Sequence, residues 1–163
     1  MTDGYSIRPY QPQDLPRLLD ITEHTFGPVS IDGNMERLLG RFGSGDWRSR
    51  KAAAIAADCQ AQPDGVFVAI DAAGRVVGYV TTRLDRDSAI GWIPNLAVDP
   101  IRQGQGVGRA LLRHALEFFR RSRMEVAKIE TLEQNPVGQS LYPSLGFREV
   151  ARQIHYAMRL GDD

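Results

Sequence analysis

The stretch Asn95-Leu-Ala-Val-Asp-Pro-Ile-Arg-Gln-Gly-Gln-Gly-Val-Gly-Arg109 indicates how the chain folds. A short apolar run ends at Asp99–Pro100, glycines punctuate the next residues, and an amphipathic run extends from Val107 to Arg123. This order predicts a strand, a glycine-rich loop and a helix. Glycines let the backbone approach a ligand closely, and the free N–H groups of a helix's first turn attract anions. The loop is therefore a candidate phosphate-binding site.

Two common phosphate-binding motifs do not fit this loop. The dinucleotide fingerprint G-x-G-x-x-G lacks its third glycine in either register, and a Walker loop needs Gly-Lys followed by Ser or Thr. What remains is Gln103-x-x-Gly106-x-Gly108, preceded by Arg102. The alternative is an ordinary turn that uses glycines for close packing.

Length and composition describe one ordinary globular domain, 1–163. Of 163 residues, 42% are hydrophobic and 25% are charged. The formal net charge is zero, which gives no broad field to attract nucleic acid or a membrane. The single cysteine, Cys59, cannot form an internal disulfide. Without a signal-like start or an apolar run of membrane length, we expect a cytoplasmic protein.

Apolar periodicity and turn residues outline the remaining elements. Strands are predicted at Tyr5–Pro9, Val66–Ile70, Arg75–Arg83, Ala89–Val98 and Val126–Leu132, with one or two more within Arg148–Leu160. Helices are predicted after a cap at Asp14, over Asn34–Leu39, Trp47–Gln60 and Val107–Arg123, and from Asn135 to Gly146. Together they predict a mixed α/β sheet in one domain.

A second motif follows the last predicted strand: Asn135, then Leu-Tyr142, then Leu-Gly-Phe147. With Gln103-x-x-Gly106-x-Gly108 before it, and a helix and a strand between, the chain resembles the GCN5-related N-acetyltransferases (GNAT). The position of Glu130 before this motif is similar to the ribosomal-protein-alanine acetyltransferase type. The resemblance covers about Ile93 to Leu160, and the first 60 residues match only in general pattern.

The resemblance implies a splayed central sheet flanked by helices, with strands that part near Val98 and Val126 to hold acetyl-CoA as co-substrate. Leu96 to Val98 would offer backbone groups to the pantetheine, the loop would hold the phosphates, and Arg102 or Arg109 would add a charge. The cofactor-binding residues it implies are Leu96, Ala97, Val98, Gln103, Gly104, Gln105, Gly106, Val107, Gly108, Arg109, Asn135 and Tyr142. No metal is expected, because the three histidines are scattered.

The implied chemistry is amine attack on a thioester, which requires a base, an oxyanion site and an acid. Tyr142 matches the position where the family often has its general acid; the alternative is that its ring only packs beside the cofactor. Glu130 is the implied base, expected to be partly desolvated in the cleft, although it could instead form a cross-strand salt bridge or face solvent. Glu133, Asp85 and Asp87 are reserve candidates.

Three points depart from the family pattern or stay open. Gly138 stands where the family usually has Ala, and Pro143 is expected to break the last helix at Tyr142. The region Gly27–Gly45 matches nothing recognisable. The acceptor is an amine on a protein N-terminus, a lysine or a small molecule, a homodimer is left open, and the non-enzymatic alternative is a silent acyl-CoA-binding regulatory module.

Overall fold

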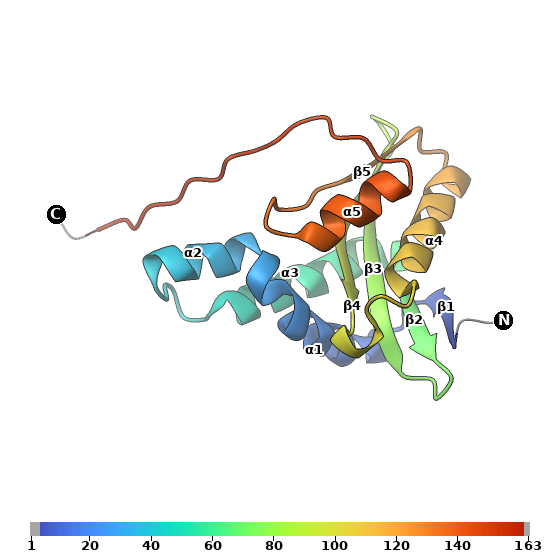
Figure 1. The fold of residues 1–163 in the computed structure, drawn as a ribbon, viewed down its shortest axis with the longest axis horizontal. Coiled ribbons are helices and arrows are strands. Elements are labelled where there is room, and N and C mark those ends of the chain that lie inside the picture. Colours follow the sequence, from blue (N-terminus) through green and yellow to red (C-terminus); the bar gives the residue numbers. More distant parts are fainter. Residues whose placement is uncertain (1–3, 162–163) are drawn as a thin grey trace.

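A computed structural model describes residues 4–161 and contains a five-stranded sheet in the order β1-β2-β3-β4-β5 (Figure 1). Neighbours from β1 to β4 are antiparallel, whereas β4 and β5 are parallel and joined through a helix. The strands are β1 (Tyr5–Pro9), β2 (Phe67–Asp71), β3 (Val76–Asp85), β4 (Ile90–Val98) and β5 (Val126–Ile129). The helices are α1 (Leu15–Phe26), α2 (Ile31–Leu39), α3 (Trp47–Ala61), α4 (Val107–Arg121) and α5 (Pro136–Ser144). The predicted mixed α/β sheet is confirmed.

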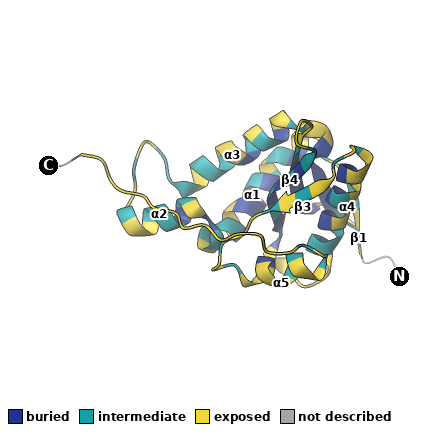
Figure 2. Ribbon diagram, turned by 90° about the horizontal axis from the view of Figure 1, so that it is seen from above, coloured by how far each residue is buried: buried dark blue, intermediate teal, exposed yellow. Residues whose placement is uncertain are grey.

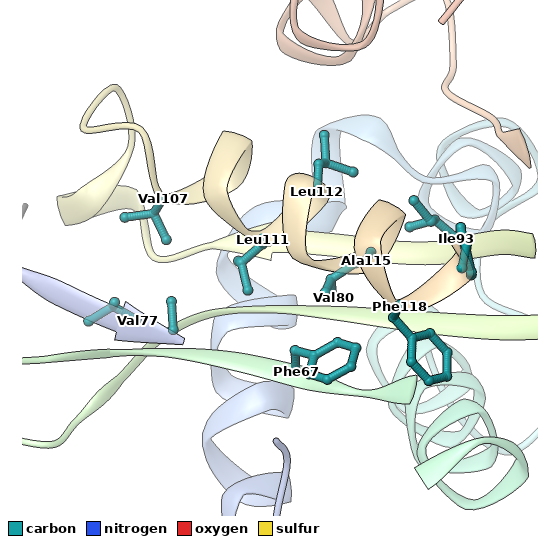
Figure 3. Packing of buried hydrophobic residues seen from close by; sticks show 11 residues of the cluster. Phe67, Val77, Val80, Ile93, Val107, Leu111, Leu112, Ala115 and Phe118 are labelled. Atoms are coloured by element: carbon teal, nitrogen blue, oxygen red, sulfur yellow. The ribbon is translucent and has the colours of Figure 1, made fainter. Parts of the chain in front are cut away.

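Helices cover both faces of the sheet, and each face has its own apolar cluster. On one face, α4 packs Leu111, Ala115 and Phe118 against β2, β3 and β4 (Figure 3). On the other face, Leu18 of α1 and Ile55 of α3 pack with alternate residues of the same strands. Figure 2 shows these buried residues as the dark interior between the helices. The amphipathic patterns of α1 and α4 therefore face the sheet.

A bulge in β4 opens the sheet on one side. Thr81 pairs with Asn95 but Arg83 pairs with Trp92, so β4 uses one more residue than β3 between the two pairs. Pro94 lies in this interval and has no N–H to donate. Beyond it, β4 loses β5 as a neighbour, because the last pair joins Ile93 to Ile129. This confirms that the two strands part.

The bulge also changes which face the side chains of β4 cover. Ile93 packs in the α4 cluster, whereas Ala97 packs with α1 and α3. Their even spacing would put them on one face of a regular strand, so the extra residue reverses the alternation. Leu96 and Val98 consequently pack toward α4.

Three predicted elements differ in the structure. The strands expected within Arg148–Leu160 are absent, because no segment of the described chain lies beside this extended stretch as a pairing partner. Strand β5 ends at Ile129, three residues early. Asp14 precedes α1, but its carboxylate accepts bonds from Arg8 and from the backbone N–H of Gln11 instead of capping the helix.

Candidate active site

The unpaired edge of β4 past the bulge is the first part of the site. The Asp99 N–H donates to Val77 C=O at 2.8 Å, which sets the alternation of hydrogen bonds between β3 and β4. In an antiparallel pair this alternation turns the backbone of Ala97 toward β3 and that of Leu96 and Val98 away from it. The N–H groups of Leu96 and Val98 therefore face the opening. The backbone groups of Ala97, which were also expected to bind a ligand, face β3 instead.

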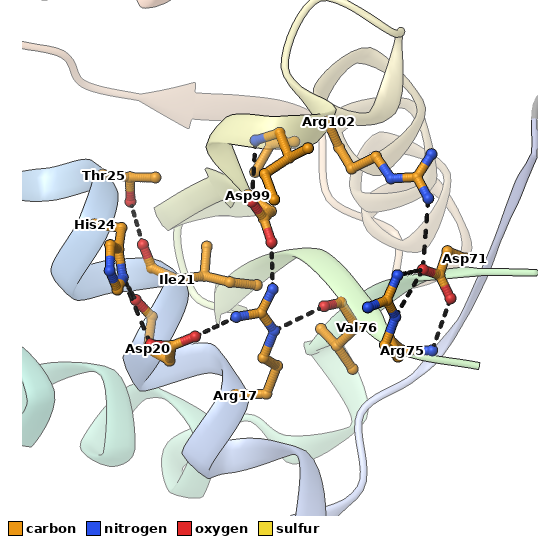
Figure 4. A network of polar contacts seen from close by, with 12 residues as sticks. Arg17, Asp20, Ile21, His24, Thr25, Asp71, Arg75, Val76, Asp99 and Arg102 are labelled. Carbon is orange, nitrogen blue, oxygen red and sulfur yellow. Dashed lines mark hydrogen bonds and ion pairs between the residues drawn. The ribbon is translucent and has the colours of Figure 1, made fainter. Parts of the chain in front are cut away.

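Salt bridges hold the start of the loop against the rest of the fold (Figure 4). Asp99 accepts from the N–H of Ile101 at 3.0 Å and from the Arg17 guanidinium on α1. Arg102 lies 3.5 Å from the Asp71 carboxylate at the β2–β3 turn. Arg102 is thus already paired with a carboxylate, and it is less suitable than Arg109 for binding a phosphate group.

The loop then turns through two glycines in left-handed conformations. Gly104 has φ 76° and Gly106 has φ 85°, and an added Cβ would strain either backbone. The side chains of Gln103 and Gln105 donate to the C=O groups of Val98 and Ile101, at 3.1 and 3.2 Å. Both glutamines therefore stabilise the loop, and they leave its backbone as the surface that a ligand meets.

Helix α4 begins directly after Gly106 and has no side-chain cap. The first helical bond runs from Ala110 N–H to Gly106 C=O, so the N–H groups of Val107, Gly108 and Arg109 have no helical acceptor. The Val107 side chain is buried, which leaves only its backbone for binding. These donors and the positive end of the helix dipole suit a phosphate.

Residues of the first turn of α4 also contact α5. A Cβ added to Gly108 would lie 3.6 Å from both Leu141 and Val98, an ordinary contact distance, so the two elements approach closely there. The Arg109 guanidinium donates to Ser144 Oγ at 2.9 Å. Arg109 also lines a surface hollow with Arg113 and Tyr5. A basic margin therefore borders the loop.

Tyr142 is fixed by the way α5 ends. The Phe147 N–H donates to Tyr142 C=O at 3.2 Å and the Gly146 N–H to Pro143 C=O at 3.0 Å, with Gly146 at φ 97°. These two bonds form a Schellman motif. The Phe147 ring meets the Tyr142 ring edge-on, with centroids 6.2 Å apart. The sequence Tyr142-x-x-x-Gly-Phe147 therefore positions the phenol as well as ending the helix.

The predicted break at Tyr142 is wrong, because α5 continues through Pro143 to Ser144. Pro143 has no N–H to donate to the C=O group four residues earlier. It lies in the last turn of α5, however, and the two Schellman bonds close that turn. The Tyr142 side chain is half-buried, and this burial raises the pKa of its hydroxyl to about 12. The phenol stays protonated at neutral pH, as a general acid must.

Glu130 lies just after β5 and is held by two neighbours. The Trp92 Nε1–H donates to one carboxylate oxygen at 2.8 Å, and the Lys128 ammonium lies 3.2 Å from the other. The side chain is 59% exposed, so the expected desolvation is not found. Trp92 was not identified from the sequence as a partner of Glu130. The available signal was a tryptophan two residues before the proline of the bulge.

The reserve bases are less suitable than Glu130. Glu133 is 86% exposed and pairs with Arg152 at 3.2 Å. Asp85 accepts from the N–H groups of Asp87 and Ser88 at the β3–β4 turn. That turn lies at the end of β4 opposite to the glycine loop.

Asn135 caps α5 instead of leaving its amide free. Its Oδ1 accepts from Gly138 N–H at 3.4 Å, and its Nδ2 donates to Thr131 Oγ1 at 2.9 Å. A Cβ on Gly138 would lie 2.6 Å from the same Thr131 oxygen. Thr131 thus explains why glycine replaces the alanine usual in the resembled family.

A buried polar network behind β4 was also missed. Asn95 donates to Asp58 at 2.7 Å and to Thr81 at 2.9 Å, and accepts from Lys51 Nζ at 3.0 Å. Burial lowers the pKa of Lys51, an effect opposed by the charges of Asp32 and Asp58. An asparagine in an otherwise apolar strand was the signal.

Within residues 4–161, no helix is long and apolar enough to cross a bilayer.

Comparison with known proteins supports the same interpretation. The model of the acetyltransferase (GNAT) family matches residues 33–147. A mycothiol acetyltransferase from Segniliparus rotundus is 30% identical over 159 residues, which cover 94% of this chain and 56% of that protein. The N-alpha-acetyltransferase RimI of Mycobacterium tuberculosis is 34% identical over 105 residues, covering 63% of this chain and 65% of RimI. The chain spans about half the length of the mycothiol acetyltransferases that it matches.

Solved structures share the fold at lower identity. Ard1 from Thermoplasma volcanium has a TM-score of 0.68 at 22% identity, over 91% of this chain and 85% of Ard1. The ribosomal-protein-S18-alanine N-acetyltransferase of Escherichia coli has a TM-score of 0.63 at 23% identity, over 90% of this chain and 79% of that enzyme.

Proposed function

The chain belongs to the acetyltransferase (GNAT) family, a family of acyltransferases that use acetyl-CoA, and on that premise we propose a direct N-acetyltransferase. The acetyl group passes from acetyl-CoA to a primary amine within a ternary complex. The observation that carries this proposal is the unpaired edge of β4 leading into the glycine loop and the uncapped start of α4. The strand edge and the helix start place backbone N–H donors in series, which suits the pantetheine arm and the diphosphate of acetyl-CoA.

The residues present fit acetyl-CoA in two regions. The N–H groups of Leu96 and Val98 would bind the pantetheine amides as a neighbouring strand would. The diphosphate would lie on the loop and on the N–H groups of 107–109, with Arg109 at its margin. Asn135 acts by placing α5, because its amide already serves the cap and Thr131.

The proposed reaction needs only groups of this chain and the two substrates. The acceptor ammonium loses a proton to Glu130, directly or through water, and the free amine attacks the thioester carbon. The Leu96 N–H, which faces the opening, is suited to the oxyanion. As the C–N bond forms and the C–S bond breaks, the Tyr142 hydroxyl gives its proton to the leaving sulfur, and the second proton released by the nitrogen restores the phenol through water. The products are the amide and CoA thiol.

The acceptor is proposed as an amine that reaches the opening between β4 and β5. The relatives include enzymes named as mycothiol acetyltransferases and one named as an N-alpha-acetyltransferase. The acceptor amine, on a small molecule or on a protein, would meet Trp92 and Glu130 at the point where the strands part. Cys59 is a buried free thiol, and free cysteines are typical of a reducing compartment, so we propose a cytoplasmic location.

The second candidate is a silent acyl-CoA-binding module. The observation that favours it is the Lys128–Glu130 pair, which engages the proposed base. Thiol release from acetyl-CoA should be measured with a panel of N-terminal peptides, lysine peptides and small amines. Acceptor-dependent release supports the transferase. Acetyl-CoA binding without release for any amine would support the silent module instead.

A further inference from the structure

The segment after α5, residues 148–160, leaves the body of the protein as an extended arm. Its large apolar side chains occupy even positions only: Val150, Ile154, Tyr156, Met158 and Leu160, which are 97, 78, 89, 75 and 86% exposed. From Gln153 onward, in Gln-Ile-His-Tyr-Ala-Met-Arg-Leu160, every second residue is a large apolar one and the residues between are polar or alanine. Alternation of this kind is typical of a strand with one buried face. The arm thus has the sequence of a sheet strand but no sheet around it.

The body of the same chain contacts the arm through polar tethers. Arg152 pairs with Glu133 at 3.2 Å, and Arg159 donates to the C=O groups of Leu39 and Arg41 at 3.0 and 2.7 Å. Figure 1 shows the arm running from α5 toward α2, away from β5. The tethers hold the arm extended and leave its apolar face uncovered.

A second feature of the structure fits this arm. β5 is the last strand of the sheet, and within residues 4–161 no strand pairs with its outer edge. Val126 of this strand is 54% exposed. The signs of charge also match: residues 125–133 carry three glutamates and one lysine, and the arm carries three arginines and one glutamate. Of these, Glu133 and Arg152 already pair within one chain.

We propose that the arm of one copy adds as a strand to the β5 edge of a second copy, and that the exchange is reciprocal. Reciprocal exchange closes a two-fold dimer in which every arm and every β5 edge is used. Thirteen extended residues reach about 43 Å at roughly 3.3 Å each, enough to cross to a neighbouring molecule. Each copy would contribute its thirteen-residue arm and the four residues of its β5 edge, which comes close to the roughly 20–30 residues a side of a stable interface.

The first test measures the mass of the intact chain by sedimentation. Wild type should sediment at twice the chain mass. Ile154→Asp with Met158→Asp, on the apolar face, should sediment as a single chain. Gln153→Asp with Ala157→Asp adds the same charge at the same spacing on the other face and should stay dimeric. All three should fold equally by circular dichroism, because the arm belongs to neither apolar cluster. A monomeric wild type, or a dimer that survives the apolar-face substitutions, overturns the proposal.

The second test asks whether the arm pairs with another copy or folds back onto its own β5. A tagged chain carrying Val126→Cys is co-expressed with an untagged chain carrying Tyr156→Cys, and both are treated with a flexible bismaleimide. Cys59 should not react, because it is buried and its pKa is raised to about 11. A tagged–untagged product is expected. If cross-linking occurs only within single chains that carry both cysteines, the exchange is refuted.

Discussion

At the scale of single residues, removal of the Tyr142 hydroxyl should lower the rate of acetyl transfer without weakening acetyl-CoA binding. Tyr142→Phe keeps the ring contact with Phe147 but removes the proton donor. We expect kcat to fall by about 10²–10⁴-fold, the range for general acid catalysis, with little change in acetyl-CoA affinity. Steady-state kinetics and calorimetric titration check this. Tyr156→Phe on the exposed arm is the matched control, and an unchanged kcat in Tyr142→Phe would exclude the acid role.

Glu130 makes a prediction about pH. At low pH the acceptor is mostly an ammonium and needs a base, whereas at high pH free amine is already present. Glu130→Gln should therefore slow turnover most at low pH, by about 10²-fold or more, and approach wild type as pH rises. Glu133→Gln, which alters a more exposed carboxylate, should follow the wild-type pH–rate profile. An equal loss at every pH would mean that the base lies elsewhere.

At the scale of elements, the end of α5 couples a helix stop to the active site. Gly146→Ala places a Cβ in a left-handed conformation and should destabilise the fold by roughly 1–2 kcal/mol. Because the same turn bonds Tyr142, kcat should also fall. Gly74→Ala, at φ 76° in the β2–β3 turn, should cost similar stability and leave kcat unchanged. Chemical denaturation and steady-state kinetics on both variants check this. If Gly146→Ala and Gly74→Ala have the same kcat, the turn after α5 does not contribute to catalysis.

Most elements could be predicted because their signals are local. The period of α4 and the two strands predicted at Val66–Ile70 and Arg75–Arg83 depend on neighbouring residues alone, and all three elements are found in the structure. Local rules fail in two places. The Pro143 prediction missed the Schellman bonds, which follow from the positions of Gly146 and Phe147. The strands expected in the arm need a partner strand, and no strand of residues 4–161 lies beside the arm.

The candidate site could be predicted only in outline, for a similar reason. Motif spacing predicted the loop between β4 and α4 and a helix that contains Tyr142, and the structure has both elements. It did not reveal which backbone groups of β4 are free, because that depends on the register with β3 and on the bulge near Pro94. Nor did it reveal the Trp92–Glu130 contact, which joins residues 38 positions apart.

At the scale of the whole molecule, the Arg8–Asp14 pair makes acid stability testable. Hydrogen bonds from Arg8 lower the pKa of Asp14 despite its burial. The pair thus stabilises the fold above the unfolded carboxyl pKa of about 3.9, and the contribution is lost as pH falls through the lowered folded value. Asp14→Asn should cost roughly 1–3 kcal/mol at pH 7, with the difference shrinking in acid. Urea unfolding across pH checks this against the exposed control Asp87→Asn; a difference independent of pH would contradict it.

The central claim is that acetyl-CoA binds along the free edge of β4 and the glycine loop. Thermal unfolding with acetyl-CoA, NADH or ATP tests it most directly, on wild type, Gly106→Val and Gly74→Val. A ligand at 100 times its dissociation constant adds about 2.7 kcal/mol, which is about 5–10 °C for a domain of this size. We predict that acetyl-CoA alone raises the midpoint, in wild type and Gly74→Val but not in Gly106→Val. No shift with acetyl-CoA, or an undiminished shift in Gly106→Val, would contradict the claim.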